Sequence, residues 1–246
     1  GKDSLYSNSS GVQNSALGYG TLYANTTGQD NVALGYIALY SNTTGGQNVA
    51  VGRQALYSNT TASNNTAMGY QAGYSQTTGN GGGGNLTAIG YQSAYSFTGS
   101  VNESYGSVFL GRQAGVNTTG GYDNAFVGAR AGNSNTTGAN NVVVGAAALY
   151  SNTTASNNTA VGYQAGYATT TGAYNTFFGA NAGRYNTANG NAFFGNGAGY
   201  ANTTGIGNSF FGALDGASGT GNPPGYANTT GNYNTALGAG SLQANT

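Results

Sequence analysis

A motif of seventeen residues recurs along this chain of 246 residues, and its period constrains the fold more than any other feature. One copy reads Asn31-Val-Ala-Leu-Gly35, then Ala38-Leu-Tyr-Ser-Asn-Thr-Thr-Gly45. A short fixed period is typical of a solenoid, in which each copy is one structural unit stacked on its neighbour. The slots that open successive copies are Asn14, Asn31, Asn48, Asn65, Leu86, Ser107, Asn124, Asn141, Asn158, Asn175, Asn191, Asn208 and Asn234.

The composition argues against several classes of function. Charged residues make up 4% of the chain, and there is no histidine or cysteine. The usual catalytic and metal-binding side chains are therefore scarce, and we expect no enzyme activity, no cofactor and no metal site. Five bases balance five acids, so no basic surface for nucleic acid is expected, and a net charge of zero permits self-association. Apolar runs are too short for membrane insertion.

Each copy contains a short segment of alternating side chains, such as Asn48-Val49-Ala50-Val51-Gly52. In a strand, the alanine and the residue after it face opposite sides, so the sequence predicts two apolar environments: the inside of a coil and a contact between chains. A second strand is expected at Ala38-Leu39-Tyr40, and Asn-Thr-Thr-Gly closes the coil as a turn. The fold class predicted is all-β, a parallel β-solenoid of about thirteen coils.

We expect one solenoid domain over 1–246, with loop insertions near 80–86, 96–106 and 215–233, where the spacing between copies is disturbed. Stacking also aligns the recurrent tyrosines. These would form an aromatic column, used either for packing or as a platform for sugars. Its members are Tyr6, Tyr23, Tyr40, Tyr57 and Tyr74, and then Tyr150 and Tyr167.

The segments Asn48–Gly52, Asn158–Gly162 and Asn234–Gly238 resemble the head repeat of YadA-like trimeric autotransporter adhesins. They are also similar to tandem repeats of phage tail-fibre-like proteins. The resemblance implies a left-handed parallel β-roll, usually trimeric, on an extracellular fibre. The seventeen-residue period and the Asn-Thr-Thr-Gly turn depart from the family's pattern.

Asn-x-Ser/Thr sequons recur with the turn, and they have two interpretations. Their asparagines could form hydrogen-bonded columns along the stack, or they could carry glycans on an exported protein. The possible glycosylation sites are Asn8, Asn25, Asn42, Asn59, Asn64, Asn85, Asn102, Asn117, Asn135, Asn152, Asn157, Asn202 and Asn228.

Both ends of the printed sequence fall inside a copy, and neither carries a polar cap. We therefore predict an extracellular or cell-surface filament, in which subunits stack head to tail as a homopolymer or homotrimer. The alternative is an adhesin head or phage tail-fibre module that binds host glycan or protein through the inserted loops. The residues expected at the assembling ends are Gly1, Leu5, Tyr6, Leu237 and Leu242.

Overall fold

The computed structural model describes residues 1–77, 84–98, 106–213 and 222–242 of the chain. These residues form short parallel strands joined by turns, with no helix among them. The predicted parallel β-solenoid with its seventeen-residue period is confirmed. The chain comprises two compact units, Gly1–Asn124 and Ala125–Thr246. A single domain over 1–246 stays a prediction.

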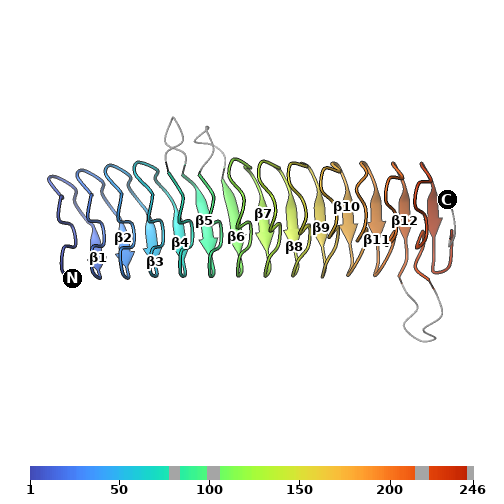
Figure 1. Cartoon of the computed structure of the whole chain (residues 1–246), viewed down its shortest axis with the longest axis horizontal. Coiled ribbons are helices and arrows are strands. Elements are labelled where there is room, and N and C mark those ends of the chain that lie inside the picture. The colour runs from blue at the N-terminus through green and yellow to red at the C-terminus, as the bar shows by residue number, and fades with distance from the viewer. Residues whose placement is uncertain (78–83, 99–105, 214–221, 243–246) are drawn as a thin grey trace. The chain divides into compact units, whose positions relative to one another are not determined.

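In the first unit, each strand pairs in parallel with the strand of the next coil (Figure 1). Equivalent residues of successive copies lie opposite one another, as Ala33 lies opposite Ala50. One copy of the motif is therefore one coil. The strands are β1 (Ser15–Leu17), β2 (Val32–Leu34), β3 (Val49–Val51), β4 (Thr66–Met68), β5 (Leu86–Ile89) and β6 (Ser107–Leu110).

The second unit repeats this parallel pairing and register, with Phe193 opposite Phe210. Its strands are β7 (Ala125–Val127), β8 (Val142–Val144), β9 (Thr159–Val161), β10 (Thr176–Phe178), β11 (Ala192–Phe194), β12 (Ser209–Phe211) and β13 (Thr235–Leu237).

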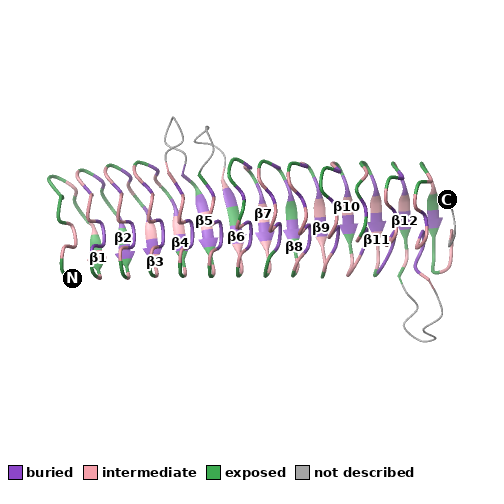
Figure 2. Cartoon of the chain, viewed as in Figure 1, coloured by how far each residue is buried: buried purple, intermediate pink, exposed green. Residues whose placement is uncertain are grey.

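The two apolar sides of each strand have different environments. The residue two positions after the opening slot, here called the inner slot, is alanine, phenylalanine or, at position 143, valine. It points into the coil, and Ala50 and Phe177 are 0% exposed. The following residue, the outer slot, points away from the coil, and Leu34 remains 42% exposed. Figure 2 shows this alternation along the strands of each unit. The inner slot is therefore the core, and the outer slot lines an open face.

The second predicted strand is wrong. After β2 every second residue has a positive φ, with values of 128° at Gly35, 46° at Ile37 and 52° at Leu39. The same alternation sends hydrogen bonds in opposite directions: the Ile37 N–H donates to Tyr19 O of the preceding coil at 2.8 Å, and the Leu39 N–H donates to Ala55 O of the next coil at 2.9 Å. This return segment joins neighbouring coils without being extended.

The inner slot shares the interior with a second core position, six residues later in most coils, which we call the return slot. Its size does not follow the inner slot in every coil: Ala67 and Ala160 accompany Gly73 and Gly166, whose Cβ positions are crowded by Leu86 and Phe177 of the following coil. Small inner residues such as Ala33 and Ala50 accompany the buried return leucines Leu39 and Leu56. Large inner residues accompany glycine instead. The pairs of this second kind are Phe109 and Gly115, Phe126 and Gly132, Phe177 and Gly183, Phe193 and Gly199, and, across an insertion, Phe210 and Gly225.

Two constraints select glycine at position 199. A Cβ atom there would lie 2.5 Å from Cε2 of Phe193, and the residue has φ of 60°. A phenylalanine ring therefore fills the volume that leucine fills in other coils. Where leucine does occupy the return slot, its left-handed backbone costs on the order of 1–2 kcal/mol. Complete burial of the side chain, which contributes about 1.5–3 kcal/mol, offsets that cost.

The insertions predicted near 80–86, 96–106 and 215–233 coincide in part with residues 78–83, 99–105 and 214–221, which lie outside the described residues. Within the third range, residues 222–233 are described and contribute to a coil. Pro224 O accepts the Gly199 N–H at 3.0 Å, and Tyr226 O accepts the Ala201 N–H at 3.0 Å. Proline fits here because it lacks only the N–H and retains the carbonyl that the neighbouring coil uses.

The exchange between slots predicts strong coupling between Phe193 and Gly199. Phe193→Ala should lose about 3–5 kcal/mol of stability through a cavity, and Gly199→Leu roughly 1–3 kcal/mol or more through overpacking. The double variant recreates the alanine–leucine pair of other coils, so its loss should be at least about 1 kcal/mol smaller than the sum. Chemical denaturation of the unsubstituted chain, the two single variants and the double variant measures these free energies of unfolding. Simple additivity would contradict volume exchange.

Candidate functional site

Buried asparagines form two columns that run along the coils of each unit. The marker column consists of the asparagines that open the copies, and the turn column consists of those in Asn-Thr-Thr-Gly. In the turn column, Nδ2 of Asn25 donates to Oδ1 of Asn8, and Nδ2 of Asn42 donates to Oδ1 of Asn25, both at 2.8 Å. In the marker column, the backbone N–H and Nδ2 of Asn48 both donate to Oδ1 of Asn31, at 3.0 and 3.1 Å.

In coils that carry both asparagines, the two columns meet at a single carbonyl. Gly45 O accepts Nδ2 of Asn31 and Nδ2 of Asn42, both at 2.9 Å. Gly205 O accepts Asn191 and Asn202 in the same way, also at 2.9 Å. Such a coil is thus closed on itself by two amides, and the same amides bond to the adjacent coil. Sequence reasoning did not find this role of the marker asparagines, although their recurrence before most strands was the available signal.

The columns are interrupted where another residue occupies the slot. Asn152 donates to Asn135 at 2.7 Å, but its own Oδ1 is buried without a hydrogen-bond partner, because Thr169 stands in the next slot. Thr169 instead donates its hydroxyl to Asn186 O at 2.9 Å. A buried acceptor left without a donor costs about 1–3 kcal/mol. This interruption is therefore a local weakness of the second unit.

The structure divides the predicted glycosylation sites into two groups. The hydrogen-bonded columns predicted for the turn are confirmed, and a glycan on Nδ2 of a column residue would displace a donor hydrogen from the interior. We therefore expect no glycan on the buried sites of the folded chain. The buried sites are Asn25, Asn42, Asn59, Asn135, Asn152, Asn202 and Asn228.

Glycosylation stays a prediction for the exposed sequons. Asn64 and Asn157 occupy the position just before the marker asparagine, with φ of 61° and 62°. Asn8, Asn85 and Asn117 are also exposed. Asn102 lies outside the described residues.

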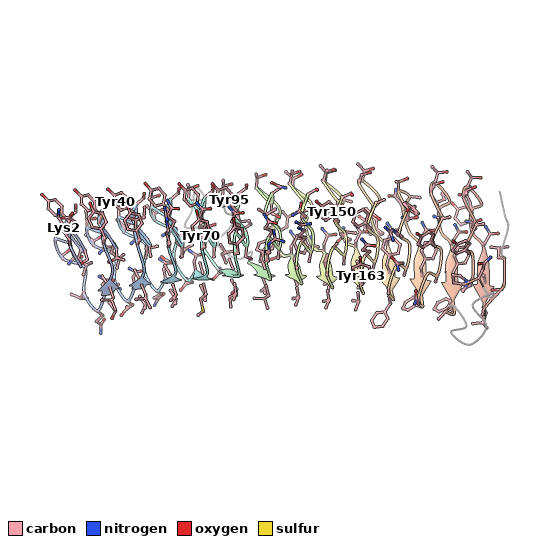
Figure 3. The ribbon with its side chains drawn as sticks, turned by 60° about the horizontal axis from the view of Figure 1, so that its bottom comes forward. Lys2, Tyr40, Tyr70, Tyr95, Tyr150 and Tyr163 are labelled. Carbon is pink, nitrogen blue, oxygen red and sulfur yellow. The ribbon has the colours of Figure 1, made fainter. Side chains whose placement is uncertain are left out.

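The predicted tyrosine column is confirmed in the first unit and extends to Tyr95. Its rings stack almost parallel, with centroids 5.0 Å apart for Tyr6 and Tyr23 and 5.1 Å apart for Tyr57 and Tyr74. Figure 3 shows Tyr40 and Tyr95 at the same edge of the stack. In the second unit, Tyr150 stacks on Tyr167 at 5.1 Å. Because neighbouring rings cover each other's faces, the column supports packing rather than a platform on which sugars stack.

Exposed apolar side chains from the outer slots and the adjacent tyrosines form a surface in the first unit that we call the outer stripe. The tyrosines are 37 to 49% exposed. An aromatic side chain presents roughly 150–250 Å² when fully exposed, so four of them leave on the order of 350 Å² uncovered. The residues of the stripe are Leu17, Tyr19, Leu34, Tyr36, Met68, Tyr70, Ile89 and Tyr91.

Arginines interrupt the tyrosines in both units. Arg53 lies between Tyr36 and Tyr70, with its guanidinium carbon 5.5 and 5.8 Å from the ring centroids. In the second unit, Arg184 lies between Tyr167 and Tyr200, at 5.6 and 5.8 Å. A guanidinium over an aromatic face is stabilised electrostatically, by about 0.5–1 kcal/mol at exposed sites.

Among the residues expected at the assembling ends, Leu5 and Tyr6 contact the next coil of their unit. The Leu5 N–H donates to Thr21 O at 3.0 Å, and Tyr6 begins the tyrosine column. Leu237 ends β13 and is 80% exposed, and Leu242 has φ of 51°, as return-slot leucines do. Gly1 is exposed. A role for these five residues in assembly stays a prediction.

Over the described ranges, the surface has no detected pocket and no cluster of three or more acidic side chains that could hold a metal ion. Within the same ranges, no helix is long and apolar enough to cross a bilayer. The features with chemical character are therefore the asparagine columns, the stacked tyrosines with their arginines, and the outer stripe. No protein-family model, curated protein or solved structure matches the chain.

Repairing the interrupted turn column should stabilise the second unit. In Thr169→Asn, Nδ2 can donate to the buried Oδ1 of Asn152, as the amides of intact coils do. We expect a gain of about 1 kcal/mol in the free energy of unfolding, measured by chemical denaturation. Thr169→Val is the control: it removes the hydroxyl without supplying an amide and should destabilise. A loss of stability in the asparagine variant would contradict the assignment.

The tyrosine column predicts a loss of stability in alkali. Burial raises the pKa of Tyr40 above its ordinary value of 10.0, and the neighbouring hydroxyls of Tyr23 and Tyr57 raise it further. The unfolded chain then loses this proton first, so the contribution to stability is full below pH 10 and is lost as the pH rises through the folded-state value. Thermal unfolding between pH 8 and pH 11 measures the decline. Tyr40→Phe should make it shallower, and an unchanged slope would contradict the prediction.

Proposed function

We propose that the chain is a structural element of an extracellular filament, whose coils continue from one copy of the chain to the next. The observation that carries this proposal is the equivalence of coil-to-coil contacts. Asn25 contacts Asn8 as Asn42 contacts Asn25, at 2.8 Å in both cases, and the strands keep one register throughout each unit. An interface built from these contacts is the same whether the next coil belongs to the same chain or to another copy.

The charge balance supports self-association. With five acids and five bases in 246 residues, copies of the chain lack the net charge that keeps proteins apart. Exposed coil faces also present unpaired backbone groups, which readily pair with another sheet edge. Axial stacking of this kind is a heterologous contact, which produces an open filament when its geometry does not close.

The outer stripe supports a second, lateral contact between copies. Its four tyrosines alone expose an area within the roughly 300–600 Å² of the largest apolar patch on a typical monomer, and the outer-slot residues Leu17, Leu34, Met68 and Ile89 add to that area. A neighbouring chain laid along the stripe would bury it, as in a homotrimer or a bundle. The YadA-like resemblance of the motif favours such an assembly, and we include a cell-surface location in the proposal.

An adhesin head or phage tail-fibre module is the alternative that follows from the resemblance. The residues expected to bind a ligand lie in loops near 80–86, 96–106 and 215–233, and about half of these residues lie outside the described part of the chain. We therefore base the proposal on the stack, whose contacts are described, and keep ligand binding through the loops as a separate hypothesis.

Electron microscopy and sedimentation of the purified chain test the filament. We expect particles many chain lengths long, with a mass that grows with protein concentration. A monodisperse species of one chain or three chains at high concentration would contradict axial stacking.

The outer stripe gives a matched test of the lateral contact. Leu34→Glu places a charge on the exposed face without entering the core, so it should separate laterally associated filaments while leaving single filaments intact. Thr44→Glu, on the exposed part of a turn, is the control and should leave lateral association unchanged. Equal effects of the two substitutions would show that the stripe is not the lateral contact.

A further inference from the structure

We propose that Arg184 and its surrounding tyrosines form a binding site for a carboxylate group of an acidic polysaccharide. Arg184 stands at the position that tyrosine occupies in neighbouring coils. Its guanidinium carbon lies 5.6 Å from the ring centroid of Tyr167, 5.5 Å from that of Tyr185 and 5.8 Å from that of Tyr200. Three rings therefore hold one cation in place.

The cation is fixed but poorly neutralised. Nη1 of Arg184 donates to Oδ1 of Asn181 at 3.2 Å, and Nε is buried with no hydrogen-bond partner. A guanidinium has five N–H donors, so most of them have no acceptor in the described part of the chain. The only carboxylate side chain in the sequence of the second unit is that of Asp215, outside the described residues. An oxyanion would supply the missing charge and acceptors.

The rings favour planar, bidentate recognition. Tyr167 and Tyr200 lie over the guanidinium from the preceding and following coils, while Tyr185 and Tyr200 meet edge to face, with centroids 5.2 Å apart and planes at 86°. This packing reduces the rotamer freedom that an exposed arginine would lose on binding. Because Nε is covered, the terminal nitrogens are the donors left for a ligand, and a two-oxygen group such as a carboxylate matches them.

The surroundings select the class of ligand. Phosphate-rich polymers require several cations near one another, whereas the whole chain has five bases and Arg184 is the single base among residues 131–213. A second copy of the chain offers few carboxylates, since there are five in 246 residues. A uronate-containing glycan combines sparse negative charge with many hydroxyls. The phenol of Tyr185, which is 43% exposed, and the amide of Asn181 are polar groups beside the guanidinium that suit such hydroxyls.

Calorimetric titration of the full 246-residue chain with a galacturonate hexamer tests the site. Binding should weaken as salt is raised through the physiological range, because a single exposed charge pair is screened there. A neutral hexose hexamer should not bind, and a sulfated hexamer should bind less tightly than the uronate. Equal binding of the neutral and uronate oligomers would overturn the proposal, as would no uronate binding or a clear preference for sulfate.

Matched variants locate the binding. Arg184→Gln should weaken uronate binding roughly tenfold or more, because it removes a charge-assisted bidentate contact. Arg130→Gln removes an exposed arginine of the same unit, and it should leave binding within about twofold. Arg184→Lys keeps the charge without the planar fork and should give an intermediate loss.

Thermal unfolding of each variant before titration distinguishes a loss of binding from a loss of folding. If Arg184→Gln lowers the unfolding temperature, Arg184→Lys supplies the comparison in a folded protein. Equal weakening by the substitutions at positions 184 and 130 would place the site elsewhere. Electron microscopy measures filament formation independently of uronate binding. An absence of uronate binding would therefore leave the stacking proposal unaffected.

Discussion

The buried side-chain amides are the interaction on which the rest of this structure depends. A coil of seventeen residues with one three-residue strand has too little apolar volume to order itself, since fixing each residue costs about 1–2 kcal/mol. The amide of Asn31 closes its coil through Gly45 O and accepts from the backbone and the side chain of Asn48. Closure and stacking are therefore performed by the same group. A coil without its neighbour would leave these amides partly unpaired, so coils are stable only as members of a stack.

The inner core fills a narrow interior although the side chain in the inner slot differs from coil to coil. Alanine with leucine and phenylalanine with glycine are two solutions to one volume, as the pairs Ala33 with Leu39 and Phe193 with Gly199 show. The backbone need not change, because leucine and glycine both adopt the left-handed conformation there. Core identity can therefore vary while the amide columns stay in register, which explains how one chain accommodates coils of such different composition.

The sequence predicted the period, the parallel stack, the inner and outer apolar slots and the tyrosine column, because each of these follows from spacing alone. It did not predict the alternating backbone of Ile37 and Leu39, since left-handed leucine contradicts local propensity and is stabilised only by burial in the stack. The sequon pattern of Asn42 matched a glycan acceptor, whereas the structure buries that side chain. Polar residues usually lie at the surface. Only the converging carbonyl of Gly45 shows why this amide is inside.

The most direct test of the central claim compares two amide-to-leucine substitutions in the first unit. Asn48→Leu removes a fully buried column member that donates to Asn31 and Ala62 and accepts from Asn65. Gln29→Leu removes an exposed amide. In chemical denaturation, the account predicts a loss of at least about 2 kcal/mol for the first and a change within about 0.5 kcal/mol for the second. Similar small changes for both would contradict the dependence of the stack on its buried amides.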